Sequence, residues 1–222
     1  MARTRLVELV GPAGAGKSTL AAVLPAADPR LRTGPSVWGL PRFDQICAAI
    51  SLLPVATAAA LSGHPFRGAE LAQMMRLVAL RRVLARTASG DIRVILLDEG
   101  PVFGLAWLEV FFESNGARFR NGWRRRARAE WAGRLDGVVR LDADDPALAR
   151  RIRTRTKPHM VKHLPDGEIS SFIARFRDAY DLVIGDMAAA GMTVQALPSS
   201  DGAFGEDAAR VRDAIERAAH GN

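Results

Sequence analysis

The chain has 222 residues, 48% of them hydrophobic and 25% charged, which is ordinary for a globular protein with a substantial core. We expect one domain over residues 1–222 and no membrane contact, because by the sequence pattern no apolar run reaches the length of a membrane span. The single cysteine, Cys47, excludes an internal disulfide and favours a cytoplasmic location. The net charge of +7 is compatible with an anionic partner but does not identify one.

Strand and helix patterns alternate along the whole chain, which predicts an α/β domain built on a parallel sheet. Pro54 lies inside one apolar helical stretch and is expected to kink or split it. Strands are predicted at 6–10, near 30–32 or 36–38, and at 92–97, 137–141 and 193–197. Helices are predicted at 43–61, 69–87, 102–112, 118–135, 169–190 and 206–219, with another that begins at Asp145-Pro146, the aspartate as its N-cap.

The first motif is a glycine-rich loop directly after the first strand, with the sequence GPAGAGKST over residues 11–19. It fits the phosphate-binding P-loop pattern G-x-x-x-x-G-K-[ST], and the strand and apolar helix that flank it are the context the pattern requires. Backbone N–H groups of such a loop point at a triphosphate, its lysine reaches the β- and γ-phosphates, and its hydroxyl binds Mg²⁺. The candidate nucleotide-binding residues are Gly11, Ala13, Gly14, Ala15, Gly16, Lys17, Ser18 and Thr19.

A second motif follows the apolar strand at 92–97, where the acids Asp98 and Glu99 stand side by side. In a parallel sheet the carboxyl ends of the strands face the ligand crevice, so Asp98 is expected to emerge beside the P-loop. Together with Ser18 it would bind Mg²⁺. Glu99 would complete the metal shell, orient an acceptor hydroxyl or act as general base. A simple turn before a helix is the alternative explanation of these acids.

A third motif is a run of cations after the helix that begins at Asp145. Alternate residues do not share a helix face, so we expect the helix to give way to a loop around 155–158. Such a segment, about 151–167, can close as a lid over phosphates and stabilise the charge that develops during transfer. A solvated helix end is the alternative. The candidate residues are Arg151, Arg153 and Arg155, followed by Lys157, His159 and Lys162, with His159 expected as a hydrogen-bonding loop residue.

With these three motifs in this order, the chain resembles the P-loop nucleoside and nucleotide kinases, the thymidylate, adenylate and deoxynucleoside kinase branch. The resemblance implies a three-layer α/β/α fold with a five-stranded parallel sheet and a small basic lid. It implies Mg-ATP as phosphate donor, a small-molecule acceptor, most often a nucleoside or nucleotide, and arginines of the lid on the transferring phosphate. The resemblance is also compatible with a homodimer.

The chain departs from this resemblance after the third strand, where it has Asp98-Glu99-Gly100-Pro101 instead of an acid followed by arginine. The acceptor is therefore the least determined part of the prediction, and a non-nucleotide metabolite is an alternative. The candidate acceptor-site residues are Arg42, Phe43, Asp44, Glu70, Gln73 and Arg76.

Two further alternatives concern other classes of protein. Adjacent Asp and Glu after a strand also occur in hydrolytic ATPases, in which the glutamate polarises water, so an ATPase with a regulatory or nucleic-acid-linked role is the main competing prediction. The stretch 118–128 carries six arginines and two aromatic residues, which would suit nucleic acid. A solvated helix face with inward-facing aromatic residues is favoured over nucleic acid here.

Overall fold

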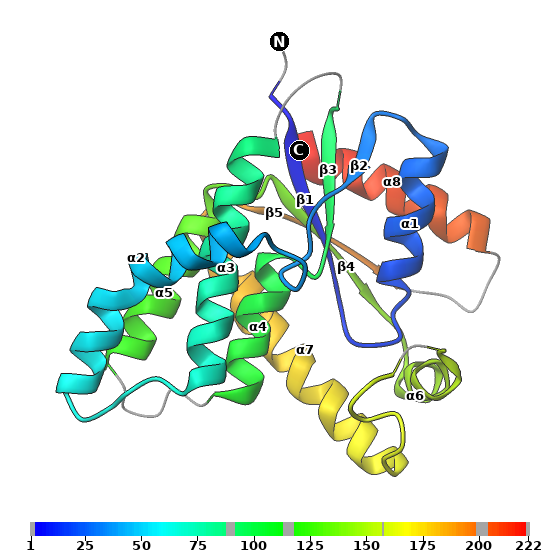
Figure 1. The fold of residues 1–222 in the computed structure, drawn as a ribbon. Helices are drawn as coiled ribbons and strands as arrows, with labels where there is room; N and C mark the ends of the chain where they lie inside the picture. Colours follow the sequence, from blue (N-terminus) through cyan, green and yellow to red (C-terminus); the bar gives the residue numbers. More distant parts are fainter. Residues whose placement is uncertain (1–2, 88–91, 113–117, 157, 199–203, 221–222) are drawn as a thin grey trace.

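A five-stranded sheet forms the centre of the molecule in the computed structural model, which describes residues 3–87, 92–112, 118–156, 158–198 and 204–220 (Figure 1). All neighbouring strands are parallel, in the order β2-β3-β1-β4-β5. This confirms the predicted sheet. The strands are β1 (Arg5–Val10), β2 (Leu31–Thr33), β3 (Val94–Asp98), β4 (Gly137–Asp142) and β5 (Thr193–Pro198).

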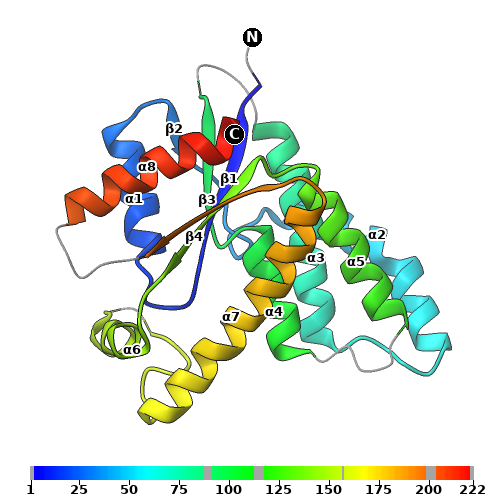
Figure 2. The ribbon, with the colours of Figure 1, turned by 180° about the vertical axis from the view of Figure 1, so that it is seen from behind.

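Helices cover both faces of the sheet, which confirms the three-layer α/β/α architecture (Figures 1 and 2). Helices α1 and α8 pack on one face, and α4 and α7 pack on the other, with α3 and α5 beside them. Helix α2 forms the outer edge, against α3 and α5. The bounds are α1 (Lys17–Ala27), α2 (Arg42–Leu61), α3 (Gly68–Thr87), α4 (Pro101–Phe111), α5 (Arg118–Ala132), α6 (Asp145–Thr154), α7 (Asp166–Ala189) and α8 (Phe204–His220).

The two central strands bring the first two sequence motifs together. β3 has the sequence VILLD and is buried along its first four residues, as expected for a strand covered on both faces. Its register pairs Asp98 with Leu9 of β1, so Asp98 emerges next to the loop that follows β1. β1 has β3 on one side and β4 on the other, which makes this edge a topological switch point, where open α/β sheets bind ligands.

The structure confirms one of the two predicted positions of the second strand and corrects local details of two helices. The second strand lies at Leu31–Thr33, and 36–38 belongs to the turn that follows it. The cap of α6 is Asp144, whose side chain accepts a hydrogen bond from the Ala147 N–H at 2.9 Å. Helix α2 continues through Pro54 without splitting. Pro54 leaves the carbonyl of Ile50 without its usual helical donor, but both residues are exposed, so water can replace the lost bond.

The length and composition of helix α2 differ from the expectation that no apolar segment is long enough to span a membrane. It is the one helix in the described parts of the chain that is long and apolar enough to span a bilayer by length and composition. Its inner face packs against α3 and α5, as the helix of a globular protein does, and these two criteria alone are weak evidence for a span.

Candidate active site

The P-loop joins β1 to α1 in a conformation that its glycines make possible. Gly11 has a φ of +145°, and a Cβ there would lie 2.0 Å from the Leu141 carbonyl oxygen. Gly14 has a φ of +87°, and a Cβ there would lie 2.9 Å from the Leu148 carbonyl oxygen. Side chains would therefore clash with β4 and α6, so the glycines let these elements approach the loop. Gly16 is the N-cap of α1 and has a left-handed backbone conformation. The N-terminus of α1 therefore points at the space in front of the loop.

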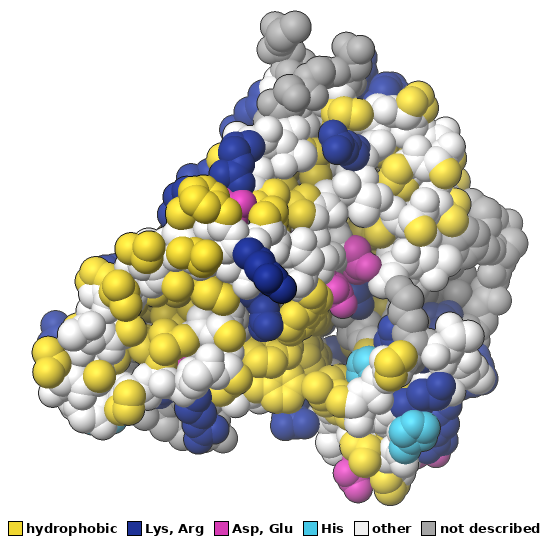
Figure 3. All heavy atoms as spheres, in the orientation of Figure 1, with side chains coloured by type: hydrophobic (Ala, Val, Ile, Leu, Met, Phe, Trp, Pro, Cys, Tyr) yellow, Lys and Arg dark blue, Asp and Glu magenta, His cyan; other side chains and the backbone are white. Residues whose placement is uncertain are grey.

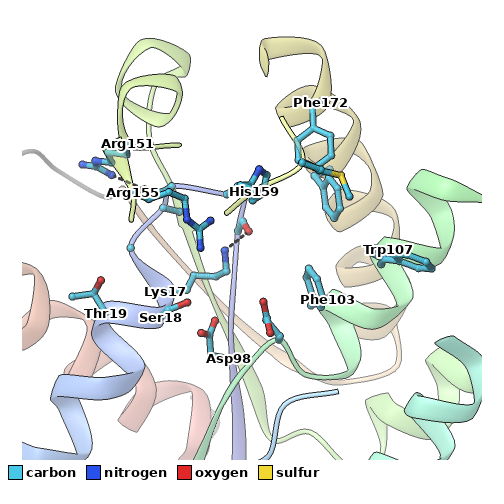
Figure 4. Close-up of a pocket in the computed structure, with 18 of the residues that line it drawn as sticks. Lys17, Ser18, Thr19, Asp98, Phe103, Trp107, Arg151, Arg155, His159 and Phe172 are labelled. Carbon is cyan, nitrogen blue, oxygen red and sulfur yellow. Dashed lines mark hydrogen bonds between the residues drawn. The ribbon is translucent and has the colours of Figure 1, made fainter. Parts of the chain in front are cut away.

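Lys17 is folded back onto this loop. Its Nζ donates to the carbonyl oxygens of Gly11 and Pro12 at 2.7 and 3.0 Å (Figure 4). Burial lowers the pKa of Lys17, while the nearby carboxylates of Asp98 and Glu99 oppose the shift. A buried ammonium that donates to two loop carbonyls in front of a helix N-terminus is suited to phosphate oxygens.

Asp98 and Ser18 face each other across the mouth of the P-loop and both line the same cavity (Figure 4). The Oδ1 atom of Asp98 is buried and has no hydrogen-bond partner among the described residues. In the described parts of the chain, no group of three or more His, Cys, Asp or Glu side chains is placed so that it could hold a metal ion. One carboxylate and one hydroxyl fit Mg²⁺, which is usually held by few protein ligands together with phosphates and water.

Glu99 adopts a strained backbone conformation, with a φ of 61°. The Ser36 hydroxyl donates to its Oε2 at 3.1 Å, and the Val37 N–H donates to its carbonyl oxygen at 3.1 Å. These contacts from the turn after β2 hold the Glu99 carboxylate at the cavity wall. Sequence reasoning missed Ser36, because the two residues are 63 positions apart and no motif links them.

A second carboxylate, Glu8 on β1, lies fully buried beneath the site. It accepts hydrogen bonds from the N–H groups of Gly100, Val102 and Phe103 at 2.8–3.0 Å, and so caps the N-terminus of α4. Burial raises the pKa of Glu8 to about 8, although the three N–H groups oppose the shift. A Cβ at Gly100 would lie 2.8 Å from the Glu8 carboxyl carbon, so a glycine fits this close approach. The sequence analysis had assigned Glu8 only to a buried strand.

The structure separates the three arginines predicted for the lid. Arg151 and Arg155 line the cavity, and an Arg151 Nη donates to the Gly14 carbonyl oxygen at 3.2 Å (Figure 4). Arg153 instead pairs with Asp166 at 2.6 Å and with the Leu164 carbonyl at 3.2 Å. Its position on α6 turns it away from its neighbours, because α6 remains helical as far as Thr154.

The segment after α6 also places His159 at the cavity. Burial lowers the pKa of His159, and the cations Arg155 and Lys17 lower it further. Its ring lies edge-on to Phe172 at 5.6 Å between centroids. Lys162 donates to the Arg155 carbonyl at 2.6 Å, and Lys157 lies outside the described residues.

An aromatic wall faces the P-loop across a cavity of about 920 Å³ (Figures 3 and 4). Residues four apart on α4 and on α7 supply most of it, and Trp38 from the turn after β2 adds to it. Sequence reasoning treated both helices as apolar and missed this wall, because a helical aromatic stripe looks the same whether it faces a core or a cavity. Its members are Trp38, Phe103, Trp107, Phe111, Phe172, Phe176 and Tyr180.

The residues predicted for the acceptor site are absent from the described cavity lining. Asp44 pairs with Arg86 at 2.5 Å and Glu70 with Arg120 at 2.6 Å. Gln73 is buried, with its amide 3.5 Å from the Gly104 carbonyl oxygen. The remaining three are Arg76, whose guanidinium carbon lies 4.5 Å from the Trp38 ring centroid, and the exposed Arg42 and Phe43.

The arginine-rich helix α5 is tied into the molecule on its inner side. Arg124 is only 3% exposed and pairs with Glu109 at 2.8 Å and with Glu70 at 3.4 Å. Arg128 pairs with Glu109 and Asp186. The predicted solvated face holds for Arg118, Arg125 and Arg126, which are exposed. It is wrong for the arginines that join α5 to α3, α4 and α7 through ion pairs.

Comparison with known proteins identifies the fold. No family model matches the sequence, and no curated protein matches it. Thymidylate kinase from Candida albicans superposes with a TM-score of 0.59 at 13% identity, over 97% of this chain and 92% of that one. Deoxyadenosine kinase from M. mycoides, solved with bound dCTP, gives 0.55 at 12% identity, over 95% and 98%. The YorR protein of Bacillus subtilis, solved in complex with phosphorylated GDP, gives 0.51 at 16% identity, over 98% and 99%.

The chain therefore has the fold of P-loop nucleoside and nucleotide kinases. This confirms the resemblance that the motifs indicated.

Proposed function

From this kinase fold, we propose that the protein transfers the γ-phosphate of ATP to a hydroxyl group of a small-molecule acceptor. The observation that carries the proposal is that a single cavity joins the P-loop and Asp98 at one end to an aromatic wall at the other. Its volume of about 920 Å³ is at the upper end for a ligand site, so it offers room for a second ligand beside the triphosphate.

The P-loop residues would hold the donor. Backbone N–H groups from Gly11 to Thr19 and the N-terminus of α1 would cradle the phosphates, as in the motif's known chemistry. Lys17 would exchange its two loop carbonyls for phosphate oxygens. Ser18 and Asp98 would bind Mg²⁺, which when present neutralises charge on the β- and γ-phosphates.

The remaining polar groups would act on the transfer itself. Glu99, oriented by Ser36, would receive the proton of the acceptor hydroxyl or direct that hydroxyl at the γ-phosphorus. Arg151 and Arg155 would stabilise the charge of the transition state from the lid segment, about 151–167. We give Arg153 a positioning role, because its contacts with Asp166 and Leu164 hold the lid to the start of α7.

The first acceptors to test are nucleosides and nucleotides, because the neighbours in fold space include a thymidylate kinase and a deoxyadenosine kinase. A kinase of a non-nucleotide metabolite uses the same machinery. An ATPase, in which Glu99 orients water, is the alternative from another class.

An acceptor panel separates these functions. The protein is incubated with Mg-ATP and each acceptor, and ADP release is followed together with the mass of the product. A kinase releases ADP at a rate that depends on the acceptor and yields an equal amount of phosphorylated acceptor. Equal ADP release with and without every acceptor would contradict the proposal. Lys17→Ala reports contaminating activity, since it should abolish both reactions.

We further propose that the chain is a single cytoplasmic domain that forms a homodimer through α2. The side chains of Phe43, Ile46, Ile50 and Leu53 are 58–68% exposed and are spaced three, four and three residues apart, so they form one apolar stripe (Figure 3). No charged side chain occurs in α2 after Asp44. Nucleic acid is not a favoured partner, because ion pairs within the molecule occupy the inner arginines of α5.

A further inference from the structure

The cavity is divided into two ends of opposite chemistry. All the charged side chains in its described lining lie at the P-loop end, where they face the donor. At the other end, α4 and α7 present rings, and Met160 joins them from the segment between α6 and α7. Apart from Glu99, which would meet the acceptor hydroxyl, polar groups that specify a second ligand would have to come from this second end, so its composition bears on the acceptor.

The rings of the far end form two facing ladders. On α4, Trp107 lies 4.9 Å from Phe111 between centroids, and on α7 Phe172 lies 4.9 Å from Phe176. Phe176 connects the two ladders, 6.1 Å from Phe111. These separations are typical of stacked and edge-to-face aromatic pairs, so the wall is packed before a ligand enters. A preformed apolar surface favours a flat, apolar body.

The same end is poor in groups that recognise a base or a phosphate. No amide, carboxylate or guanidinium side chain from α4 or α7 appears in the described lining. The polar side-chain groups among the rings are the indole N–H groups of Trp38 and Trp107, the Tyr180 hydroxyl and the His159 imidazole beside Phe172. The acids of α2 and α3 that were candidates for this task are paired elsewhere, Asp44 with Arg86 and Glu70 with Arg120. Arg76 lies against the Trp38 ring and outside the described lining. A nucleobase edge placed here would lose its hydrogen bonds to water without replacement.

We infer that the acceptor is an uncharged alcohol on an apolar, ring-bearing body, and that a nucleoside monophosphate is a poor substrate. This inference rests on the proposed phosphoryl transfer and specifies its acceptor. The body would lie against the α4 and α7 ladders, with its hydroxyl directed at the P-loop end. The hydroxyl oxygen bonds to the γ-phosphorus while the bond from that phosphorus to the β,γ-bridging oxygen breaks. ADP leaves with the electron pair, and the hydroxyl proton passes to the Glu99 carboxylate and then to water.

Binding tests the acceptor class without requiring turnover. The protein is saturated with Mg²⁺ and a non-hydrolysable ATP analogue and titrated in a calorimeter with 2-naphthaleneethanol, thymidine and thymidine monophosphate. We expect the naphthalene alcohol to bind about tenfold or more tightly than thymidine, because each polar group buried without a partner lowers affinity. We expect the monophosphate to bind more weakly still. Thymidine or its monophosphate binding as tightly as the alcohol, or more tightly, would overturn the inference.

A matched pair of variants ties this binding to the wall. Trp107→Ala should weaken the naphthalene alcohol about tenfold or more while leaving affinity for the ATP analogue unchanged, and Trp107→Phe should restore most of it. Phe119→Ala, on α5 outside the described lining, is the control and should bind the alcohol as wild type does. Unchanged alcohol affinity in a Trp107→Ala protein that binds the ATP analogue normally would contradict the assignment.

These results are distinguishable from a failure of the kinase proposal. If ADP forms at the same rate with every acceptor in the panel, phosphoryl transfer itself is wrong, and the inference falls with it. If nucleosides or nucleotides are the acceptors that become phosphorylated, the kinase proposal stands and only the acceptor class is overturned.

Discussion

At the scale of single residues, the carboxylates of Asp98 and Glu8 lie on neighbouring central strands but have different roles. Asp98 lines the cavity and has a buried oxygen with no hydrogen-bond partner in the part of the chain that the structure describes. Glu8 instead uses both oxygens to accept from the N–H groups at the start of α4. The P-loop and Asp98 could be predicted because their spacing is dictated by phosphate chemistry. Glu8 and Ser36 could not, because each acts on a segment far away in the chain.

Glu8→Gln tests the buried cap. Glutamine places an NH₂ group where one of the two Glu8 oxygens accepts a backbone N–H, so one donor loses its partner and we expect a loss of about 1–3 kcal/mol in the free energy of unfolding. The folded pKa of about 8 lies above the ordinary value of 4.5, so the stability linked to protonated Glu8 is present below 4.5 and is lost as the pH rises through 8. The margin of wild type over the variant should shrink from pH 5 to pH 9 in urea unfolding. A constant margin would contradict this account.

Ser36→Ala tests the orientation of Glu99. Without the hydroxyl at 3.1 Å the carboxylate loses its fixed direction, so we expect phosphoryl transfer to slow about tenfold or more at an unchanged KM for ATP. Ser51→Ala is the control, because that hydroxyl bonds only within α2, to the Ala48 carbonyl. Equal rates for the two variants would remove Ser36 from the site.

At the scale of elements, α6 and α7 frame the phosphate end of the cavity. Arg177 of α7 holds Asp142 at the end of β4 at 2.9 Å, and it also pairs with Asp145 at the start of α6. The capped start of α6 could be predicted to within one residue from Asp-Pro chemistry. The change from helix to loop around 155–158 could also be predicted, since α6 ends at Thr154. The directions of the arginine side chains could not be predicted, because the charge pattern does not show which of them face the cavity.

Alanine substitutions at Arg151, Arg153 and Arg155, on α6 or directly after it, can be compared with one another. Replacing Arg151 or Arg155 with alanine should slow transfer about a hundredfold while changing ATP binding far less, because both face the cavity. Arg153→Ala should stay within a few-fold of wild type, because Arg153 pairs with Asp166. Rates and ATP affinities measured on the three proteins check this, and a rate loss confined to Arg153→Ala would reverse the assignment.

At the scale of the whole molecule, the order of strands and helices could be read from hydrophobic periodicity, since each buried parallel strand leaves an apolar run. The aromatic end of the cavity could not be predicted from this periodicity, because it depends on how α4 and α7 pack against each other. The exposed stripe of α2 likewise becomes visible only in the folded molecule.

Sedimentation velocity tests the α2 stripe. Wild-type protein should sediment as a dimer, and Ile50→Glu should sediment as a monomer with an unchanged circular dichroism spectrum, because a charge in the centre of an apolar interface is desolvated without a partner. Leu182→Glu, at another exposed leucine on α7, should leave the dimer intact. A monomeric wild type would contradict the proposed interface.

The fate of the γ-phosphate tests the central claim most directly. With ATP labelled at the γ-phosphate and an acceptor alcohol present, the account predicts that the label moves to the acceptor in proportion to the ADP formed. It also predicts that Lys17→Ala stops the transfer. Label released as inorganic phosphate at the same rate with and without the acceptor would contradict it, because the cavity would then deliver the phosphate to water.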